Sequence, residues 1–124
     1  MNRIPEWAAR YLSIPYEKCD CWELVRKVYS AEFGIDVGGV EKQSGKMKDN
    51  EWVDVVKDGL GIREGDVILF KRSILNKHVG IILNHELMLH TTNGSNSCIE
   101  RWKSPVWDKR WVSIYRHRSE CSSI

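Results

Sequence analysis

The spacing of the hydrophobic positions changes along the chain, from helical in the first half to alternating in the second. Apolar residues recur at helical spacing from Cys21 to Val28, directly after Asp20, a residue type that caps helix N-termini. Glycine commonly ends a helix, so the pattern predicts a helix from Asp20 to about residue 33, before Gly34.

A shorter helix is predicted before this one and another after it. The first covers about residues 4–12, where Pro5 suits the first helical turn. The second starts at Asn50, carries three apolar residues and ends at Gly59. The Gly- and Lys-rich stretch 35–49 has weak periodicity and is predicted to be a mobile connection.

After residue 65 the apolar residues alternate with polar ones, a pattern typical of strands. The predicted strands are 66–71, 78–84, 86–92, 97–102 and 111–117. Helices followed by a consecutive antiparallel meander predict an α+β fold, with N-terminal helices packed on an antiparallel β-sheet of about five strands. The Cys21 thiol should then point toward the sheet, whereas Cys19 lies outside the helix.

Composition is that of one soluble globular domain covering residues 1–124, with 42% hydrophobic and 29% charged residues. The net charge of +2 does not by itself indicate a nucleic-acid partner. Basic residues gather near the C-terminus, at Arg101, Lys103, Lys109, Arg110, Arg116 and Arg118. We interpret them as a solvated face around the last strand and expect no nucleic-acid binding.

The N-terminal segment has no uninterrupted apolar stretch of the kind that a signal peptide carries. The longest apolar runs, VILF and VGIIL, are too short to span a bilayer, so no membrane association is expected. We therefore expect synthesis in the cytoplasm without a signal peptide. In that setting the four cysteines are free thiols first and disulfide partners second.

Cys19 and Cys21 raise the question of a metal site. A zinc site takes four cysteine or histidine ligands, often in two close pairs, and the second pair here would have to be His78 and His90. Because the candidate ligands are scattered and no Cys-x-x-Cys or His-x-x-x-His pair is present, we expect no metal and no cofactor.

A catalytic cysteine is the alternative. The N-terminus of a helix favours the thiolate of a residue placed there, and a neighbouring histidine completes the activation. Cys21 has the first property, although a lone cysteine on an apolar helix face also fits a small buried hydrophobic residue. The two histidines downstream favour the catalytic interpretation.

His78 begins one predicted strand and His90 ends the apolar run LMLH of the next, with Asn84, His85 and Glu86 as the tight connection between the two apolar runs. If these three residues form the hairpin loop, paired positions sum to about 170, and the two histidines are diagonal neighbours on one face. A two-residue loop would place them on opposite faces. His85 and His117 are predicted to be surface residues.

With these residues in place, the sequence resembles the NlpC/P60 cysteine peptidases of the papain-like fold. The resemblance lies in an Asp-Cys pair opening a helix (Asp20-Cys21), a Gly-Asp followed by an apolar strand (65–70), an HVGI segment (78–81), and a strand ending in a polar residue (88–90). All four occur in family order, and the resemblance covers about residues 11–117.

The resemblance implies a catalytic set in which Cys21 is the nucleophile, His78 the general base and His90 the residue that orients the base. It implies hydrolysis of amide bonds in peptidoglycan stem peptides, next to γ-D-glutamate. Cys19 is then a bystander.

The resemblance also implies three substrate-binding residues. Asp20 occupies the position that meets the amine end of the stem peptide in related enzymes, and Tyr16 matches a family tyrosine. Trp22 either lines the cleft or packs on the sheet.

The stretch DCWELVRKVY, residues 20–29, and the closing segment 107–116 are similar to a branch of the family found in phage tail proteins. This implies other phage tail proteins as partners, and a place in the virion or delivery to the periplasm or cell wall. A different class of function stays open, namely a structural or assembly component of a tail tip that keeps the fold with little or no catalysis.

Overall fold

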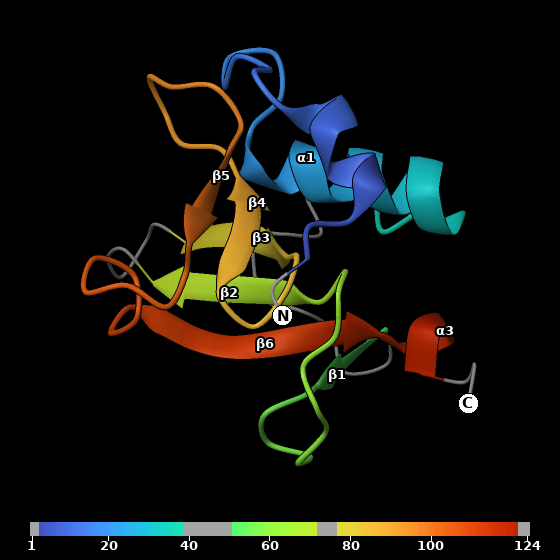
Figure 1. Cartoon of the computed structure of the whole chain (residues 1–124). Coiled ribbons are helices and arrows are strands. Elements are labelled where there is room, and N and C mark those ends of the chain that lie inside the picture. The colour runs from blue at the N-terminus through green and yellow to red at the C-terminus, as the bar shows by residue number, and fades with distance from the viewer. Residues whose placement is uncertain (1–2, 39–50, 72–76, 122–124) are drawn as a thin grey trace.

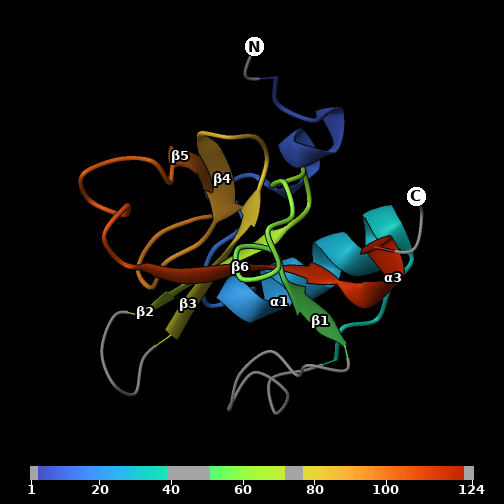
Figure 2. The ribbon, with the colours of Figure 1, turned by 90° about the horizontal axis from the view of Figure 1, so that it is seen from below.

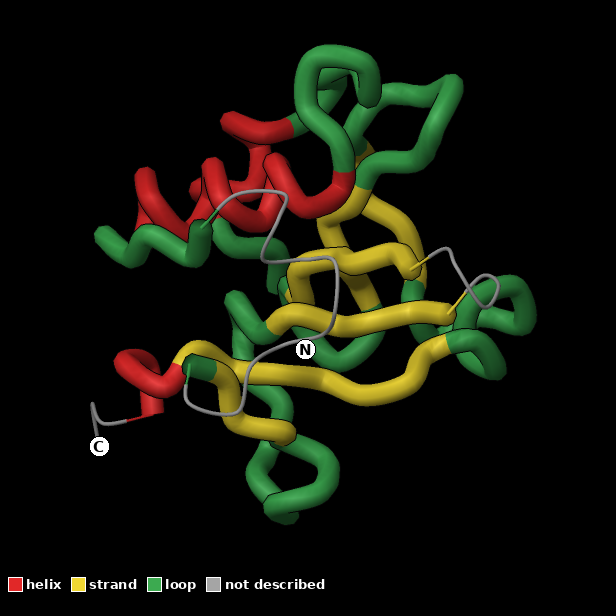
Figure 3. The backbone as a smooth tube through the Cα atoms, turned by 180° about the vertical axis from the view of Figure 1, so that it is seen from behind, coloured by secondary structure: helices red, strands yellow, loops and turns green. Residues whose placement is uncertain are grey.

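Antiparallel strands form one continuous sheet, and helices cover one of its faces (Figures 1 and 3). The computed structural model describes residues 3–38, 51–71 and 77–121. Within them the sheet has six strands in the order β1-β6-β2-β3-β4-β5. The strands are β1 (Trp52–Asp54), β2 (Val67–Lys71), β3 (Lys77–Ile82), β4 (Leu87–His90), β5 (Cys98–Arg101) and β6 (Trp111–His117).

The predicted strands are confirmed, but their order differs from a simple consecutive meander. Strands β2 to β5 follow one another as predicted, whereas β6 returns to pair with β2 and takes β1 as its other neighbour. The helix predicted after Asn50 is wrong, because Trp52–Asp54 is a strand paired with β6 at the edge of the sheet (Figure 2). A partner more than fifty residues away decides this, and no local periodicity reports it.

The predicted helix after Asp20 is confirmed as α1 (Cys21–Val28), continued by a π-helical turn, η2 (Tyr29–Phe33). The Asp20 carboxylate accepts a hydrogen bond of 2.9 Å from the backbone N–H of Glu23, and Gly34 ends the helix in the left-handed conformation, with φ of 68°.

The first predicted helix is present as a 3-10 helix, η1 (Glu6–Tyr11), and a short α3 (Arg118–Cys121) follows β6. Most of the predicted mobile connection, residues 39–49, lies outside the described residues, as does Asn50. None of the described helices has the length and apolar character needed to cross a bilayer.

The sheet separates two hydrophobic clusters. One contains the apolar side of α1 with Val79 and Ile81 of β3, and Cys21 belongs to it. The other contains Phe70 of β2 and Trp107 from the segment between β5 and β6. Both faces of the central strands are therefore covered, which explains why β2 is apolar at four consecutive positions.

The prediction that the clustered basic residues lie on a solvated face is wrong for one of them. Arg116 is buried and forms two parallel hydrogen bonds with the buried carboxylate of Asp66, at 2.8 and 2.9 Å. Its guanidinium also donates to the carbonyl oxygen of Gly61 at 2.6 Å. This pair ties the start of β2 to β6 across the sheet.

Candidate active site

His78 and His90 meet across β3 and β4. Their ring nitrogens, Nε2 of His78 and Nδ1 of His90, are 2.8 Å apart. The strand register pairs Ile81 with Leu89, so paired positions sum to 170 and the predicted three-residue loop is confirmed. The side chain of Asn84 fixes this loop, because its amide oxygen accepts hydrogen bonds from the backbone N–H groups of Glu86 and Leu87.

Gly80 makes room for this contact. A Cβ atom at Gly80 would lie 3.0 Å from Sδ of Met88 and 3.3 Å from Cβ of His90. Even an alanine would require Met88 and His90 to shift by a few tenths of an ångström. The glycine of the HVGI segment is therefore explained by close approach of the neighbouring strand, without any positive φ.

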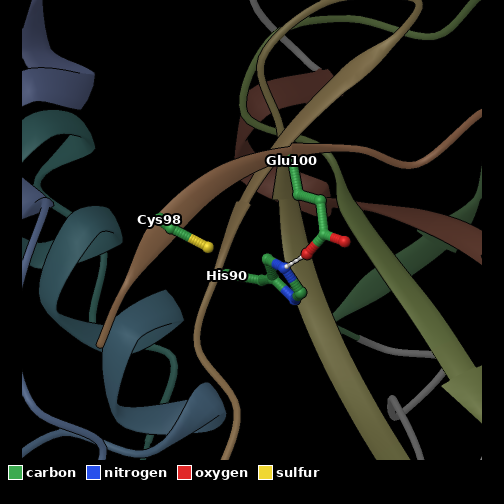
Figure 4. Close-up of side chains that lie close together, drawn as sticks. All are labelled: His90, Cys98 and Glu100. Atoms are coloured by element: carbon green, nitrogen blue, oxygen red, sulfur yellow. Dashed lines mark hydrogen bonds and ion pairs between the residues drawn. The ribbon is translucent and has the colours of Figure 1, made fainter. Parts of the chain in front are cut away.

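Glu100, which is not among the predicted site residues, extends the pair into a chain. Oε1 of Glu100 lies 2.7 Å from Nε2 of His90 (Figure 4), and Oε2 accepts a hydrogen bond of 2.9 Å from the indole N–H of Trp107. The register pairs His90 with Cys98, which places Glu100 on the same face as a diagonal neighbour. Residues 91–97 contain an Asn-Gly pair, which is a strong turn signal, but a two-residue turn at that pair would shift the register by one residue and put Glu100 on the opposite face from His90. Only strand alternation hinted at Glu100.

The carboxylate sets the direction of every hydrogen bond in the chain. An ionised carboxylate only accepts, so His90 carries its proton on Nε2 and its Nδ1 accepts the N–H of His78. Nδ1 of His78 is then the nitrogen able to take a proton. Burial raises the pKa of Glu100, but the hydrogen bonds from Trp107 and His90 outweigh it and the pKa is lowered, which keeps the acceptor ionised.

Trp107 covers the two imidazoles. Its ring stacks on His78 at a centroid distance of 5.5 Å and meets His90 edge-on at 5.2 Å. His78 is 3% exposed and His90 is 1% exposed. The histidine pair is therefore shielded from bulk water, which strengthens its hydrogen bonds.

Cys21 opens α1, as predicted, and it is buried. Helix α1 packs against β3, and the two elements begin at the same end of the molecule in Figures 1 and 3. The element ends that carry Cys21 and His78 are thus on the same side of the fold. Cys19 is buried in the turn before the helix, where burial raises the pKa of its thiol.

The three predicted substrate-binding residues have different environments. Asp20 is half-buried and caps α1, and Tyr16 is half-buried in a loop tied by its backbone N–H to the carbonyl of Ser95 at 3.0 Å. Trp22 is 2% exposed and donates a hydrogen bond of 3.0 Å to the carbonyl of Gly38. This favours the packing alternative for Trp22 over a place in the cleft.

Two more predictions concern the remaining histidines. His85 is exposed at the hairpin tip, as predicted. His117 lies only partly at the surface, because it is half-buried and its ring meets Trp52 edge-on at a centroid distance of 5.2 Å.

Residues 6–116 match the model of the NlpC/P60 family. The murein DD-endopeptidase MepS/murein LD-carboxypeptidase of Escherichia coli K12 is 26% identical over 97 residues, which is 78% of this chain and 48% of that protein. The protein of that name from Escherichia coli O157:H7 matches to the same extent. The chain therefore spans about half the length of the curated relatives it matches.

Among solved structures, an NlpC/P60 family protein from Bacillus cereus ATCC 10987 superimposes with a TM-score of 0.70 at 20% identity, covering 94% of this chain and 41% of that one. This likeness concerns the fold, and it agrees with the predicted α+β architecture. Together with the family match over most of the sequence, it shows that the chain belongs to the NlpC/P60 family.

Proposed function

We propose that the chain is a cysteine peptidase that hydrolyses amide bonds of peptidoglycan stem peptides, with Cys21, His78 and His90 as its catalytic residues. The observation that carries this proposal is the directed chain from Glu100 through His90 to His78. A buried histidine oriented in this way is suited to act as a general base, and α1, which packs against β3, starts with a cysteine.

In the proposed reaction the Cys21 thiol gives its proton to Nδ1 of His78, and the thiolate attacks the amide carbonyl. The backbone N–H of Cys21, at the start of α1, supports the negative charge on the oxygen. His78 then protonates the leaving amine, and water hydrolyses the thioester with His78 again as base. The His90 contact holds the imidazole in place throughout, and the cycle uses no cofactor or metal.

Asp20 and Tyr16 are the proposed substrate contacts. One carboxylate oxygen of Asp20 is used by the helix cap, which leaves the other for the amine end of a stem peptide. The family resemblance supports a scissile bond next to γ-D-glutamate. The curated relatives are named for cleavage of DD and LD bonds, so product analysis distinguishes the bonds.

We also propose that the protein acts as part of a phage tail, in the virion or after delivery to the cell wall. The support is the similarity of residues 20–29 and 107–116 to the tail-associated branch. The rival function, a structural tail component without catalysis, predicts no hydrolysis of wall fragments by the purified protein.

Mass spectrometry of purified muropeptides after incubation tests the proposal. The parent protein should release products cut next to γ-D-glutamate, and Cys21→Ser, a nearly isosteric variant, should release none. Products cut at DD or LD bonds would instead assign the cleavage to those bonds. Equal hydrolysis by the parent and Cys21→Ser would refute the catalytic assignment, and no hydrolysis by either would favour the structural role.

A further inference from the structure

The side chains of His90, Cys98 and Glu100 converge between β4 and β5 (Figure 4). Cys98 pairs with His90 in the register, and Glu100 follows two residues later on the same face of β5. Nε2 of His90, Sγ of Cys98 and a carboxylate oxygen of Glu100 all lie within 4.8 Å of one another. Ligand atoms of one zinc ion are about 3 to 4 Å apart, so small side-chain movements would complete a site.

We infer that these three side chains bind Zn²⁺ and that the bound ion inhibits the peptidase. The inhibition rests on the proposed function, whereas the binding does not. Imidazole, thiolate and carboxylate are all zinc ligands, and three of them leave a fourth position for water. The thiolate favours zinc over Mg²⁺ and Ca²⁺, which prefer oxygen ligands alone.

The surroundings fit an ion that enters from solvent. Cys98 is exposed, and the Glu100 side chain is 44% exposed, while His90 closes the inner side of the group. Groups around the site already hold the ligands in place. Trp107 donates to the second oxygen of Glu100, and His78 engages the other nitrogen of His90. Such outer contacts orient ligands and raise metal affinity.

Zinc at this position would reverse the hydrogen bonds of the catalytic histidines. The ion takes the lone pair of Nε2 of His90, so the neutral ring carries its proton on Nδ1, which faces Nε2 of His78. His78 must then accept this bond and carry its own proton on Nδ1. That nitrogen can no longer take the proton of Cys21. The displaced proton of the Cys98 thiol goes to solvent.

Zinc binding is measured by competition with a chromophoric chelator, using the folded full chain. The parent and Cys21→Ser should each bind one Zn²⁺, and Cys98→Ser should bind at least tenfold more weakly, while Mg²⁺ should not compete. Binding to Cys98→Ser that equals the parent would overturn the site. Loss of binding in Cys21→Ser would also overturn it, since the ion would then lie on the nucleophile.

Inhibition is measured on muropeptide hydrolysis. Zn²⁺ should reversibly inhibit hydrolysis by the parent protein. Cys98→Ser should hydrolyse the muropeptide at the parent's rate without zinc, and Zn²⁺ should not inhibit it. Equal zinc sensitivity of the two would overturn the inhibitory role. Nitrogen NMR of the histidine rings reads the same step without turnover, because zinc should move the His78 proton from Nε2 to Nδ1. An unchanged His78 tautomer in the zinc-bound parent would refute the mechanism, and absent hydrolysis with intact zinc binding would refute only the proposed function.

Discussion

The indole N–H of Trp107 donates to Oε2 of Glu100 at 2.9 Å, which leaves Oε1 for His90 at 2.7 Å. Two N–H donors thus face one carboxylate, and only a group with two acceptor oxygens satisfies both. This geometry makes Glu100 a positioning residue for the histidine pair. The relationship gives the first prediction.

Glu100→Gln should lower kcat by roughly tenfold or more, although the side chain keeps its shape. The amide offers one oxygen, and if Trp107 takes it, the NH₂ group faces His90 and forces its proton onto Nδ1. His78 is then held in the wrong tautomer. The measurement is kcat and KM on a muropeptide, with KM expected to change little.

The double variant Glu100→Gln, Trp107→Phe separates this effect from simple damage to the fold. Without the indole N–H the amide oxygen is available to His90, so the double variant should be more active than Glu100→Gln alone. If the fold-loss in kcat of the double variant equals the product of the fold-losses of Glu100→Gln and Trp107→Phe measured singly, Glu100 and Trp107 do not act together through His90.

The two histidines should differ in their importance. His78→Ala removes the proton acceptor and should lower turnover by at least about a hundredfold. His90→Ala leaves the base but frees it to rotate, so its loss should be smaller, and His90→Asn should recover part of it, because an amide oxygen still accepts the N–H of His78.

His85→Ala is the matched control, since this exposed residue lies at the tip of the same hairpin. It should keep full activity and the parent's thermal transition. A folded and fully active His78→Ala would remove the histidine from the proposed mechanism.

Thiol labelling tests the assignment of the nucleophile. Iodoacetamide at about pH 6 should modify Cys21 faster than Cys19 or Cys98, because burial, which is only partial for Cys98, raises the pKa of these two thiols and keeps them protonated. Peptide mapping after short exposure measures the three rates. Faster modification of Cys19 would place the reactive thiol outside the helix. His78→Ala should slow the labelling of Cys21 alone.

Features set by neighbours in sequence could be predicted, and features set by distant pairing could not. The cap at Asp20 and the hairpin that aligns His78 with His90 depend on a few adjacent residues, and both were predicted. The strand at Trp52–Asp54 depends on β6, and the place of Glu100 depends on a register across a seven-residue connection. In both cases the deciding contact is tertiary.

The buried pair of Asp66 and Arg116 should dominate the stability of the sheet. Arg116→Met leaves a buried carboxylate without its partner, and should lower the free energy of unfolding by about 3 to 5 kcal/mol. Urea unfolding followed by circular dichroism measures this loss.

Arg101→Met is the matched control, because Arg101 forms an exposed pair with Glu86 at 3.3 Å. Its cost should stay below about 1 kcal/mol. Asp66→Asn combined with Arg116→Met should cost less than the sum of the two single changes, since no unpaired charge remains. An Arg116→Met variant as stable as Arg101→Met would show that the pair contributes little.

The last prediction concerns pH. The Tyr11 hydroxyl donates to Oε2 of Glu32 at 2.6 Å, which fastens η1 onto η2. This hydrogen bond is the main cause that lowers the pKa of Glu32, so its stabilising contribution is present above the ordinary value of 4.5 and is lost as the pH falls below it. Burial, followed by the same bond, raises the pKa of Tyr11 from 10.0 to about 12, so that contribution is present below 10.0 and is lost as the pH rises toward about 12. The thermal transition of the parent should therefore lie at a higher temperature than that of Tyr11→Phe near neutral pH. This difference in transition temperature should become smaller toward acid pH and toward alkaline pH.

Arg10→Gln is the control, because it removes an exposed charge that pairs with the same carboxylate. Introduced into both proteins, it should leave most of the difference between parent and Tyr11→Phe intact. A gap between parent and Tyr11→Phe that is constant from acid to alkaline pH would show that this hydrogen bond does not form in solution.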